Sequence, residues 1–359
     1  MQSNNQNLRE RYQKLKNEQP RLRIRNAAQA LEVSELELLE LQLGDQLIRL
    51  AGDWKEFLPK VKALGKVMAL TRNEYAVHER KGIYDNISFM HGGQMGVAVN
   101  PDIDLRFFMT QWSYAYASTQ LNPRTKKPLY GLQFFNDRGV AVHKIYLTPH
   151  SDETAYHQLV AEYRGEDQGT PATINHSPVE PKEYHSDAEV DVEAFQAEWL
   201  ALEDTHDFFP LLRKHKVQRL QALRLAPADH AYPVAKEGIV QLFESVAASQ
   251  LPIMVFANSP GCIQIHTGPI KKLFPMEQWF NIMDPDFNLH LNLDGVDQVW
   301  VVKKPTADGI VTGLEVFDRE GQLIIYCFGK RKPGIPELEA WRETVAQLPK
   351  IQNAYEKQA

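Results

Sequence analysis

An internal repeat constrains the fold of this 359-residue chain more than any other feature. The stretch NPDIDLRF at 100–107 matches DPDFNLHL at 284–291, and GLQFFNDRGVAV at 131–142 matches GLEVFDREGQLI at 313–324. The matched segments lie 184 and 182 residues apart, which is nearly one spacing. A repeat of this length predicts a tandem duplication, in which each copy folds in the same way.

Each copy begins with helical patterns. Residues 27–43 predict two short helices, and Ser34 with Glu37 has the spacing of a capping box. In the second copy, helical patterns run from Glu193 to about Leu225 and again from Pro233 to Ser249.

Strand patterns follow the helices in both copies. β-Branched and aromatic runs alternate with Gly, Asn-Pro and Asp, and residues 131–148 predict a hairpin around NDRG. We therefore predict an α+β fold that is a tandem structural duplication. Each half has helices plus a large antiparallel sheet, and a ligand cleft lies between the halves.

Composition places the boundary between the halves. Residues 166–192 are rich in Pro, Glu and Ser with little periodicity, which predicts a linker. The N-terminal half is then 1–165 and the C-terminal half 193–359.

Charge, cysteine content and hydropathy exclude several classes of protein. A net charge of −6 disfavours specific binding to nucleic acid, and two cysteines build neither a disulfide framework nor a thiolate zinc site. The N-terminus has no apolar signal-peptide core, and no run of about 18 apolar residues could span a bilayer. We expect a cytoplasmic protein that is not a membrane protein.

One histidine stands on an apolar helical face. Phe195, Trp199, Leu202, His206 and Phe209 follow one another in steps of four, three, four and three residues. Two explanations remain open. His206 is either a buried, hydrogen-bonded structural histidine or a ligand that faces something in need of a nitrogen donor.

Pro210 limits the helix around this histidine. A proline clashes with the carbonyl four residues earlier, here that of His206, so the helix must start, kink or end close by. Asp207 could cap a new helix that begins near Phe208, with Pro210 in its first turn.

The surroundings of His206 favour a ligand that brings its own donors. No local cluster of His and Cys provides the three or four ligands of a zinc site. Haem carries four nitrogens of its own and needs one or two axial ligands. Its carboxylates need basic partners, and the second half offers Arg219, Lys303-Lys304 and Lys330-Arg331-Lys332.

Four stretches carry a resemblance to a known family: LEDTHDFFPLLRKH, DLRFFMTQWSYAY, VWVVKKPTADGIVTGLEVFD and YCFGKRKPGIPE. They resemble the HemS/ChuS/ShuS/PhuS/HmuS family, the haemin-degrading and haem-trafficking proteins of Gram-negative bacteria. The resemblance extends from about Arg25 to Leu348. It implies a cytoplasmic protein built as a structural duplication, with haem as ligand or substrate.

The resemblance also assigns roles to residues. It implies that His206 is the proximal ligand of the haem iron and that Arg106 reaches across the cleft from the first half as the distal arginine. His78 matches a histidine that some members use for a second haem. The remaining haem contacts implied are Arg219, Lys304 and Arg331 at the propionates and pocket edge, and Met254, Phe256, Tyr326 and Phe328 at the apolar faces.

Simpler roles stay open for two of these residues. Arg106 could only pair with Asp102 or Asp104 in a loop, and His78 could point to solvent from a strand of alternating polarity. One departure from the family is clear. Some members have additional histidines beside the proximal position, whereas this chain reads THDFF there.

Two functions share this site. The first is oxidative opening of the haem ring with release of iron, which needs an external electron donor such as a reductase or a reduced nicotinamide. The second is a non-catalytic carrier that takes haem from an inner-membrane importer to a separate haem oxygenase. A nucleic-acid-binding regulator fits the negative charge badly.

Overall fold

The computed structural model describes residues 2–44, 46–121, 126–180, 182–332 and 334–351. The chain divides into two compact units. The N-terminal unit comprises Met1–Arg72, Glu79–Pro178 and Asn258–Gln264, and the C-terminal unit comprises Asn73–His78, Val179–Ala257 and Ile265–Ala359. Each unit therefore includes a short segment from the other half of the sequence.

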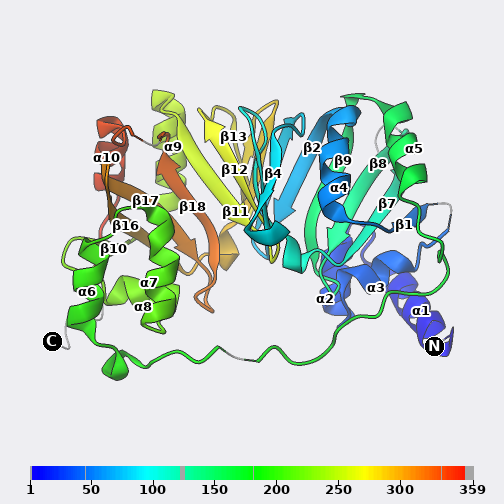
Figure 1. Cartoon of the computed structure of the whole chain (residues 1–359), viewed down its shortest axis with the longest axis horizontal. Coiled ribbons are helices and arrows are strands. Elements are labelled where there is room, and N and C mark those ends of the chain that lie inside the picture. The colour runs from blue at the N-terminus through cyan, green and yellow to red at the C-terminus, as the bar shows by residue number, and fades with distance from the viewer. Residues whose placement is uncertain (1, 45, 122–125, 181, 333, 352–359) are drawn as a thin grey trace. The chain divides into compact units, whose positions relative to one another are not determined.

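The described strands belong to two nine-stranded sheets, and helices flank the strands in each unit (Figure 1). Within the N-terminal unit, five strands pair in the order β1-β7-β8-β9-β2 and three pair in the order β6-β5-β4, all antiparallel. Its elements are α1 (Gln2–Glu18), α2 (Ile24–Ala30), α3 (Glu35–Glu40), β1 (Leu47–Leu50), α4 (Trp54–Lys60), η1 (Val61–Leu64), β2 (Gly65–Arg72), β4 (Ile87–Met90), β5 (Met95–Val99), β6 (Asp104–Phe108), β7 (Tyr114–Leu121), β8 (Pro128–Phe135), β9 (Ala141–Ser151) and α5 (Glu153–Glu162).

The C-terminal unit repeats this order. Five strands pair as β10-β16-β17-β18-β11 and three as β15-β14-β13. Strands β3 (Ala76–Gly82) and β12 (Cys262–Gly268) are divided between the units. The remaining elements are α6 (Val192–Leu200), η5 (Thr205–Asp207), α7 (Phe208–Lys214), α8 (Arg219–Arg224), β10 (Ala231–Val234), α9 (Gly238–Ser249), β11 (Ile253–Asn258), β13 (Leu273–Met276), β14 (Trp279–Met283), β15 (Phe287–Asn292), β16 (Gln298–Thr306), β17 (Gly309–Phe317), β18 (Leu323–Gly329) and α10 (Glu339–Ala346).

The predicted fold class is confirmed, because both units contain helices and antiparallel strands in the same order. The predicted capping box is present as well: the backbone N–H of Glu37 donates to Ser34 Oγ, and the N–H of Ser34 donates to Glu37. One helix starts later than predicted. Residues 231–234 pair with β16, so α9 begins at Gly238.

The five-strand run of the C-terminal unit is covered on both faces. Helices α9 and α10 bury residues such as Leu242 and Trp341 against Val255 and Leu314. The opposite face carries α6, α7 and α8, whose apolar residues cluster with Trp300, Val302 and Phe317. Strands covered on both sides are apolar almost throughout, which explains the continuous buried run in β17.

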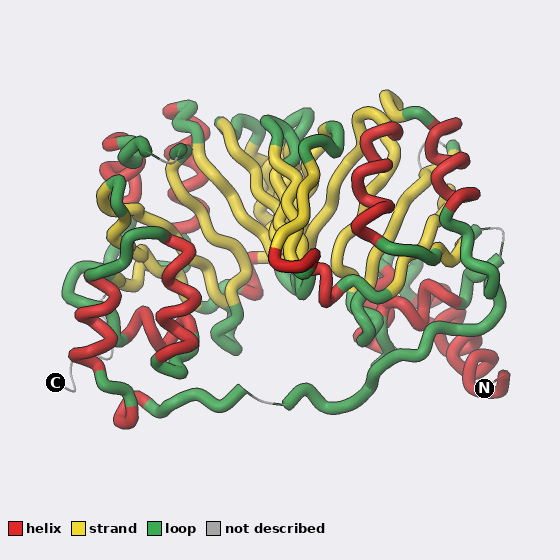
Figure 2. Tube along the Cα trace, in the orientation of Figure 1, coloured by secondary structure: helices red, strands yellow, loops and turns green. Residues whose placement is uncertain are grey.

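In the predicted linker, residues 166–180 and 182–191 form loop with one short 3-10 turn, η4 (Asp187–Glu189), and Val192 already begins α6 (Figure 2). Its first part is bonded to the N-terminal unit, where Gln168 Nε2 donates to the carbonyl of Arg49 at 2.8 Å. Its last part is bonded to the C-terminal unit, where the backbone N–H of His185 donates to the carbonyl of Lys216 at 2.8 Å.

Among the described residues, no helix is both long and apolar enough to cross a membrane.

Candidate functional site

His206 lies in a tight turn between two helices of the C-terminal unit. Helix α6 ends at Leu200, η5 holds His206, and α7 begins at Phe208 with Pro210 in its first turn, as the sequence predicts. The predicted cap is wrong in one respect. Asp204 is the residue whose carboxylate accepts from the backbone N–H of His206, at 2.8 Å, whereas Asp207 makes no side-chain cap of α7.

The break changes which aromatic residue is buried. The predicted face continues through Phe208, which is 1% exposed and meets Trp199 edge-on at 4.8 Å between ring centroids. Phe209, predicted on that face, is 63% exposed. One continuous helix would have buried Phe209, but the turn at 205–207 shifts the phase.

The side chain of His206 is 88% exposed, so it is not a buried structural histidine. Its Nδ1 lies 2.6 Å from Asp204 Oδ1. The backbone N–H of His206 and this imidazole both lower the pKa of the Asp204 carboxyl below its usual value. An exposed imidazole whose other nitrogen contacts a carboxylate is suited to bind a metal centre.

Four half-buried apolar side chains share one face of the same unit. Strands β11 and β18 pair Met254 with Phe328 and Phe256 with Tyr326, so the four side chains point to the same side. The rings of Phe256 and Tyr326 stack at 4.5 Å, and Phe328 meets both edge-on. We call these four residues the aromatic face.

Gly313 of β17 lies opposite Phe328. A Cβ at this position would stand 2.7 Å from Cε1 of the Phe328 ring. Glycine therefore lets the ring lie across the strand, and a larger residue would push it away from the aromatic face.

A buried cluster of three charges borders the aromatic face. Arg219 of α8 donates to both carboxylate oxygens of Glu315 at 2.7 Å, and Lys304 Nζ donates to Glu315 at 3.0 Å. Both cations lie near aromatic rings: Lys304 Nζ is 4.2 Å from the Phe208 centroid, and Arg219 Cζ is 5.6 Å from that of Tyr326. We call Arg219, Lys304 and Glu315 the charge triad.

The triad carries one more positive than negative charge at neutral pH. Burial lowers the pKa of Lys304 to about 8, although Glu315 opposes this effect. Burial acts to raise the pKa of Glu315, but Arg219 and Lys304 outweigh it and lower that pKa to about 2. Two cations thus share one carboxylate, and the remaining positive charge can pair with a second anion.

The triad adds a residue to the predicted site. Lys304, predicted as a contact of the propionates and pocket edge, has a side chain that is only 4% exposed. Sequence reasoning did not select Glu315. The sequence could have pointed to it, because Glu315 is an acidic residue inside the apolar run VTGLEVF. A charge buried in such a run requires a partner of opposite charge.

Arg331 lies beside the turn that holds His206. Its Nη2 donates to Thr205 Oγ1 at 3.5 Å, and its charge lowers the pKa of Asp204. The structure thus places Arg331 with His206, and it brings the triad and the aromatic face together in the same unit.

Arg106 belongs to β6 of the N-terminal unit and pairs with Asp104, one of the two partners considered from the sequence. It also donates to the carbonyl of Leu105 at 3.1 Å. Its side chain is 31% exposed. The role of Arg106 as a distal arginine stays a prediction, as does the cleft between the halves.

His78 is fully buried in the C-terminal unit, so it does not point to solvent. Its ring lies 5.0 Å from that of Phe287, and His266 stacks on the same ring at 3.7 Å. Haem could reach His78 only after this packing opened. A second haem site at His78 stays a prediction.

The N-terminal unit has a charged side chain at the position that Tyr326 occupies in the aromatic face. The pairing of Gln133 with Lys144 occupies the place of Glu315 with Tyr326 in the repeat. Lys144 forms a buried ion pair with Glu35 of α3. The two copies therefore share a fold but differ here, because the first copy has a lysine in an ion pair where the second has the ring of Tyr326.

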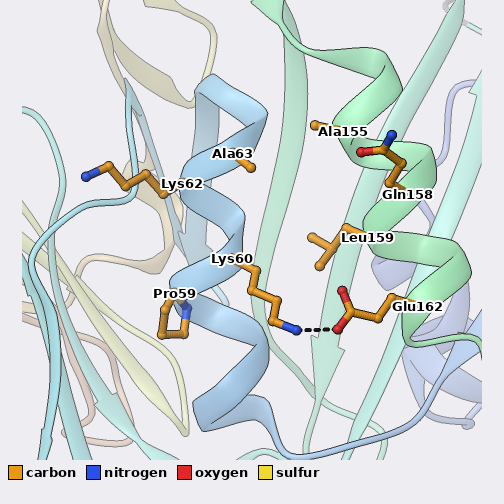
Figure 3. Close-up of a pocket in the computed structure, with 8 residues that line it drawn as sticks. All are labelled: Pro59, Lys60, Lys62, Ala63, Ala155, Gln158, Leu159 and Glu162. Atoms are coloured by element: carbon orange, nitrogen blue, oxygen red, sulfur yellow. Dashed lines mark hydrogen bonds and ion pairs between the residues drawn. The ribbon is translucent and has the colours of Figure 1, made fainter.

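A groove of about 480 Å³ in the N-terminal unit lies between α4–η1 and α5 (Figure 3). Lys60 and Glu162 form an ion pair across it, and Leu159 also lines the groove. None of its eight lining residues is aromatic or histidine, so the groove does not suit a haem.

The described residues contain no group of three or more His, Cys, Asp or Glu placed to hold a metal ion. A metal bound at His206 would therefore have to bring most of its own ligands, as iron in a porphyrin does. The exposed imidazole, the aromatic face and the surplus cation fit the iron, the ring and the carboxylates of haem, respectively.

Comparisons with known proteins identify the family. The model of the haemin-degrading HemS/ChuX domain matches residues 32–163 and again residues 216–348. The haemin transport protein HemS of Yersinia enterocolitica is 36% identical over 340 residues, which cover 94% of this chain and 96% of the relative.

Solved structures agree with the sequence comparisons. Holo-PhuS, a heme-binding protein from Pseudomonas aeruginosa, is 44% identical with a TM-score of 0.92 and matches 97% of this chain and 99% of its own. ChuS, an E. coli heme oxygenase, is 33% identical with a TM-score of 0.84, and the match covers 95% of this chain and 99% of the ChuS chain. The chain, with a family domain in each of its two copies, belongs to the haemin-degrading HemS/ChuX family.

Proposed function

We propose that this protein binds haem in its C-terminal unit, with His206 as the axial ligand of the iron, and serves haem-iron utilisation in the cytoplasm. One observation carries the proposal: a solvent-exposed imidazole, oriented by a carboxylate, shares a unit with the aromatic face and the charge triad. Relatives described as heme-binding and haemin transport proteins support the ligand.

Different side chains contact different parts of the haem. Met254, Phe256, Tyr326 and Phe328 offer apolar and aromatic surface to the porphyrin. The surplus positive charge of the triad pairs with a propionate carboxylate, and Arg331 provides a second cation beside the His206 turn. Haem that lacks free carboxylates would lose these contacts.

We further propose that the bound haem is degraded, with its ring opened and its iron released. A relative described as a heme oxygenase supports this function. Haem itself supplies the redox chemistry, while the protein orients it, excludes competing ligands and offers a donor on the distal side. The candidate donor is Arg106, and the reaction requires an external electron donor.

A non-catalytic carrier is the second candidate. The description of a relative as a haemin transport protein favours it. Arg106 pairs with Asp104, and a donor held by an ion pair is less available to a bound ligand. A carrier would receive haem from an importer and pass it to a separate oxygenase.

The axial ligand is tested by titrating haem into the purified protein and into a His206→Ala variant. We expect the wild type to give a sharp Soret band of histidine-ligated haem and the variant to lose it or to show a changed ligand spectrum. His157→Ala, an exposed histidine of α5, is the matched control and should behave as wild type. An unchanged His206→Ala spectrum would reject this ligand.

The two functions are separated by adding a reductant to the haem complex in air. Loss of the Soret band, a bilin product and chelatable iron indicate degradation. A persistent band, followed by transfer to an added acceptor, indicates a carrier. Arg106→Ala should slow degradation if Arg106 is the distal donor, and should leave the Soret band of the initial complex in place.

A further inference from the structure

We infer that Asp204 is a positioning residue, which holds the imidazole of His206 so that Nε2 faces the haem iron. The inference rests on the proposed function and deepens it, because it assigns a role to a residue behind the ligand. One carboxylate oxygen of Asp204 makes two contacts with His206.

Asp204 Oδ1 contacts both the backbone and the ring of His206. It accepts the backbone N–H at 2.8 Å and lies 2.6 Å from Nδ1. An ionised carboxylate can only accept hydrogen bonds, so the neutral ring must carry its proton on Nδ1. The lone pair is then on Nε2, the nitrogen that points away from the carboxylate.

The carboxylate is itself held in place. The backbone N–H of Asp204 donates to Asp207 Oδ2 at 3.1 Å, and the hydroxyl of Thr205 donates to Asp204 Oδ1 at 3.4 Å. Arg331 donates to the same hydroxyl at 3.5 Å. The turn therefore fixes Asp204 before a ligand arrives.

An exposed imidazole needs such support. With 88% of the His206 side chain exposed, neighbouring side chains cover little of it. A ring that rotates freely would lose rotational freedom on binding iron, which weakens affinity. A carboxylate on the second nitrogen orients the ring and makes it a stronger donor to a metal.

Asp204 also caps the turn, and this structural role needs separate variants. Asp204→Asn keeps the cap and an acceptor oxygen but removes the charge, because Asn is a good capping residue. Asp204→Ser keeps the cap, while its short side chain cannot reach Nδ1. Asp207→Asn is the matched control, since Asp207 belongs to the same capping box and its Oδ2 accepts the backbone N–H of Asp204.

The first measurement uses the protein without haem. Nitrogen-15 NMR at pH 8.5 reports which ring nitrogen of His206 carries the proton, with the signal assigned by its absence in His206→Gln. We expect Nδ1–H in the wild type and in Asp207→Asn, and a shift toward Nε2–H in Asp204→Ser. A wild-type ring protonated on Nε2, or no change in Asp204→Ser, would overturn the inference even if haem binds.

The second measurement uses the ferrous haem complex. We expect the iron–histidine stretching frequency to fall from wild type to Asp204→Asn and further in Asp204→Ser, with haem affinity about 10- to 100-fold weaker in Asp204→Ser. Equal frequencies in all variants would reject the role at the iron. A wild-type complex without a histidine ligand would instead reject the proposed function, and the inference with it.

Discussion

At the scale of single residues, the turn between α6 and α7 decides the chemistry of His206. Asp204 caps the N-terminus of the turn η5, and Pro210 requires a new helix start within four residues. The imidazole is exposed because it lies on this turn, whereas the next apolar side chain, Phe208, is buried.

A second histidine shows the opposite environment. His143 is fully buried in the N-terminal unit, where Nε2 lies 2.5 Å from the hydroxyl oxygen of Tyr84 and Nδ1 lies 2.8 Å from Thr71 Oγ1. The hydroxyl of Thr71 in turn donates to Cys262 Sγ at 3.6 Å. The chain of bonds is consistent if the neutral ring carries its proton on Nδ1.

This burial predicts a pH dependence. Burial lowers the pKa of His143 from 6.5 to about 3, so the unfolded chain binds the proton that the folded protein refuses. The contribution of the neutral His143 ring to the free energy of unfolding is fully present above pH 6.5 and is lost as the pH falls toward 3. The loss should reach about 2 kcal/mol at pH 5.

Urea denaturation at pH 7.5 and pH 5 tests this dependence. His143→Gln removes the titrating group and keeps hydrogen-bonding atoms, so its free energy of unfolding should fall by about 2 kcal/mol less than that of the wild type. His157→Gln, in an exposed position, should keep the wild-type dependence. Equal losses in wild type and His143→Gln would show that His143 is not the group responsible.

The charge triad predicts an unequal effect of removing its members. Glu315→Gln leaves Arg219 and Lys304 buried without a counter-charge and should cost about 3–5 kcal/mol of stability. Lys304→Met keeps the two-bond contact between Arg219 and Glu315 and should cost about 1 kcal/mol. In thermal unfolding, the double variant Lys304→Met/Glu315→Gln should be more stable than Glu315→Gln alone, because it leaves one buried cation without a counter-charge instead of two. Equal losses in the two single variants would contradict this account.

At the scale of elements, strand register determines which side chains can meet a planar ligand. In β11 and β18 every second residue lies in the core, which leaves Met254, Phe256, Tyr326 and Phe328 together on the other face. The alternation is visible in the sequence. The partner strand is not, because pairing is set by contacts between distant segments.

Two equivalent glycines provide a test of this face. Gly313→Ala would place a Cβ 2.7 Å from the Phe328 ring, and Gly131→Ala would place one 2.8 Å from Tyr146 in the other unit. Each should cost about 1–3 kcal/mol of stability by overpacking. Only Gly313→Ala should weaken haem binding, by about tenfold, or 1.4 kcal/mol.

The haem affinities of the Gly313→Ala and Gly131→Ala variants are compared by calorimetric or spectroscopic titration. If Gly131→Ala weakened binding as much as Gly313→Ala, general destabilisation would explain the effect. If neither weakened it, the ring of Phe328 would not be part of the site.

At the scale of the whole molecule, the duplication is modified by an exchange of short segments. Asn258–Gln264 completes the N-terminal unit, and Asn73–His78 completes the C-terminal unit. Ser259 Oγ donates to the carbonyl of Val142 at 2.6 Å, and Asn73 Nδ2 donates to the carbonyl of Ile324 at 2.7 Å. Neither half of the sequence contains the whole of its unit.

Because these segments are exchanged, a substitution in one half of the sequence should loosen strands of the unit that is formed mainly by the other half. Ser259→Ala should raise hydrogen–deuterium exchange in β9 of the N-terminal unit, and Asn73→Ala should raise it in β18 of the C-terminal unit. Each lost bond should cost about 1–3 kcal/mol, because it leaves a buried carbonyl without that donor.

Ser249→Ala is the matched control, since Ser249 bonds a carbonyl of its own helix and lies at an exposed position. Exchange mass spectrometry of the three variants locates the change. Faster exchange confined to the half that carries each substitution would contradict the assignment of these segments.

The sequence by itself determined the duplication, the helix-then-strand order of each copy and the position of His206 at a helix break just before Pro210, because these depend on spacing and local sterics. Only the tertiary structure decided that Phe208 rather than Phe209 is buried, that Lys304 lies inside with Glu315 as its partner, and that His78 is covered by Phe287. It also decided which unit each exchanged segment completes. The physical reason is the same in each case: burial and charge pairing depend on contacts between residues up to 251 positions apart, and a local pattern can mark such a residue but does not identify its partner.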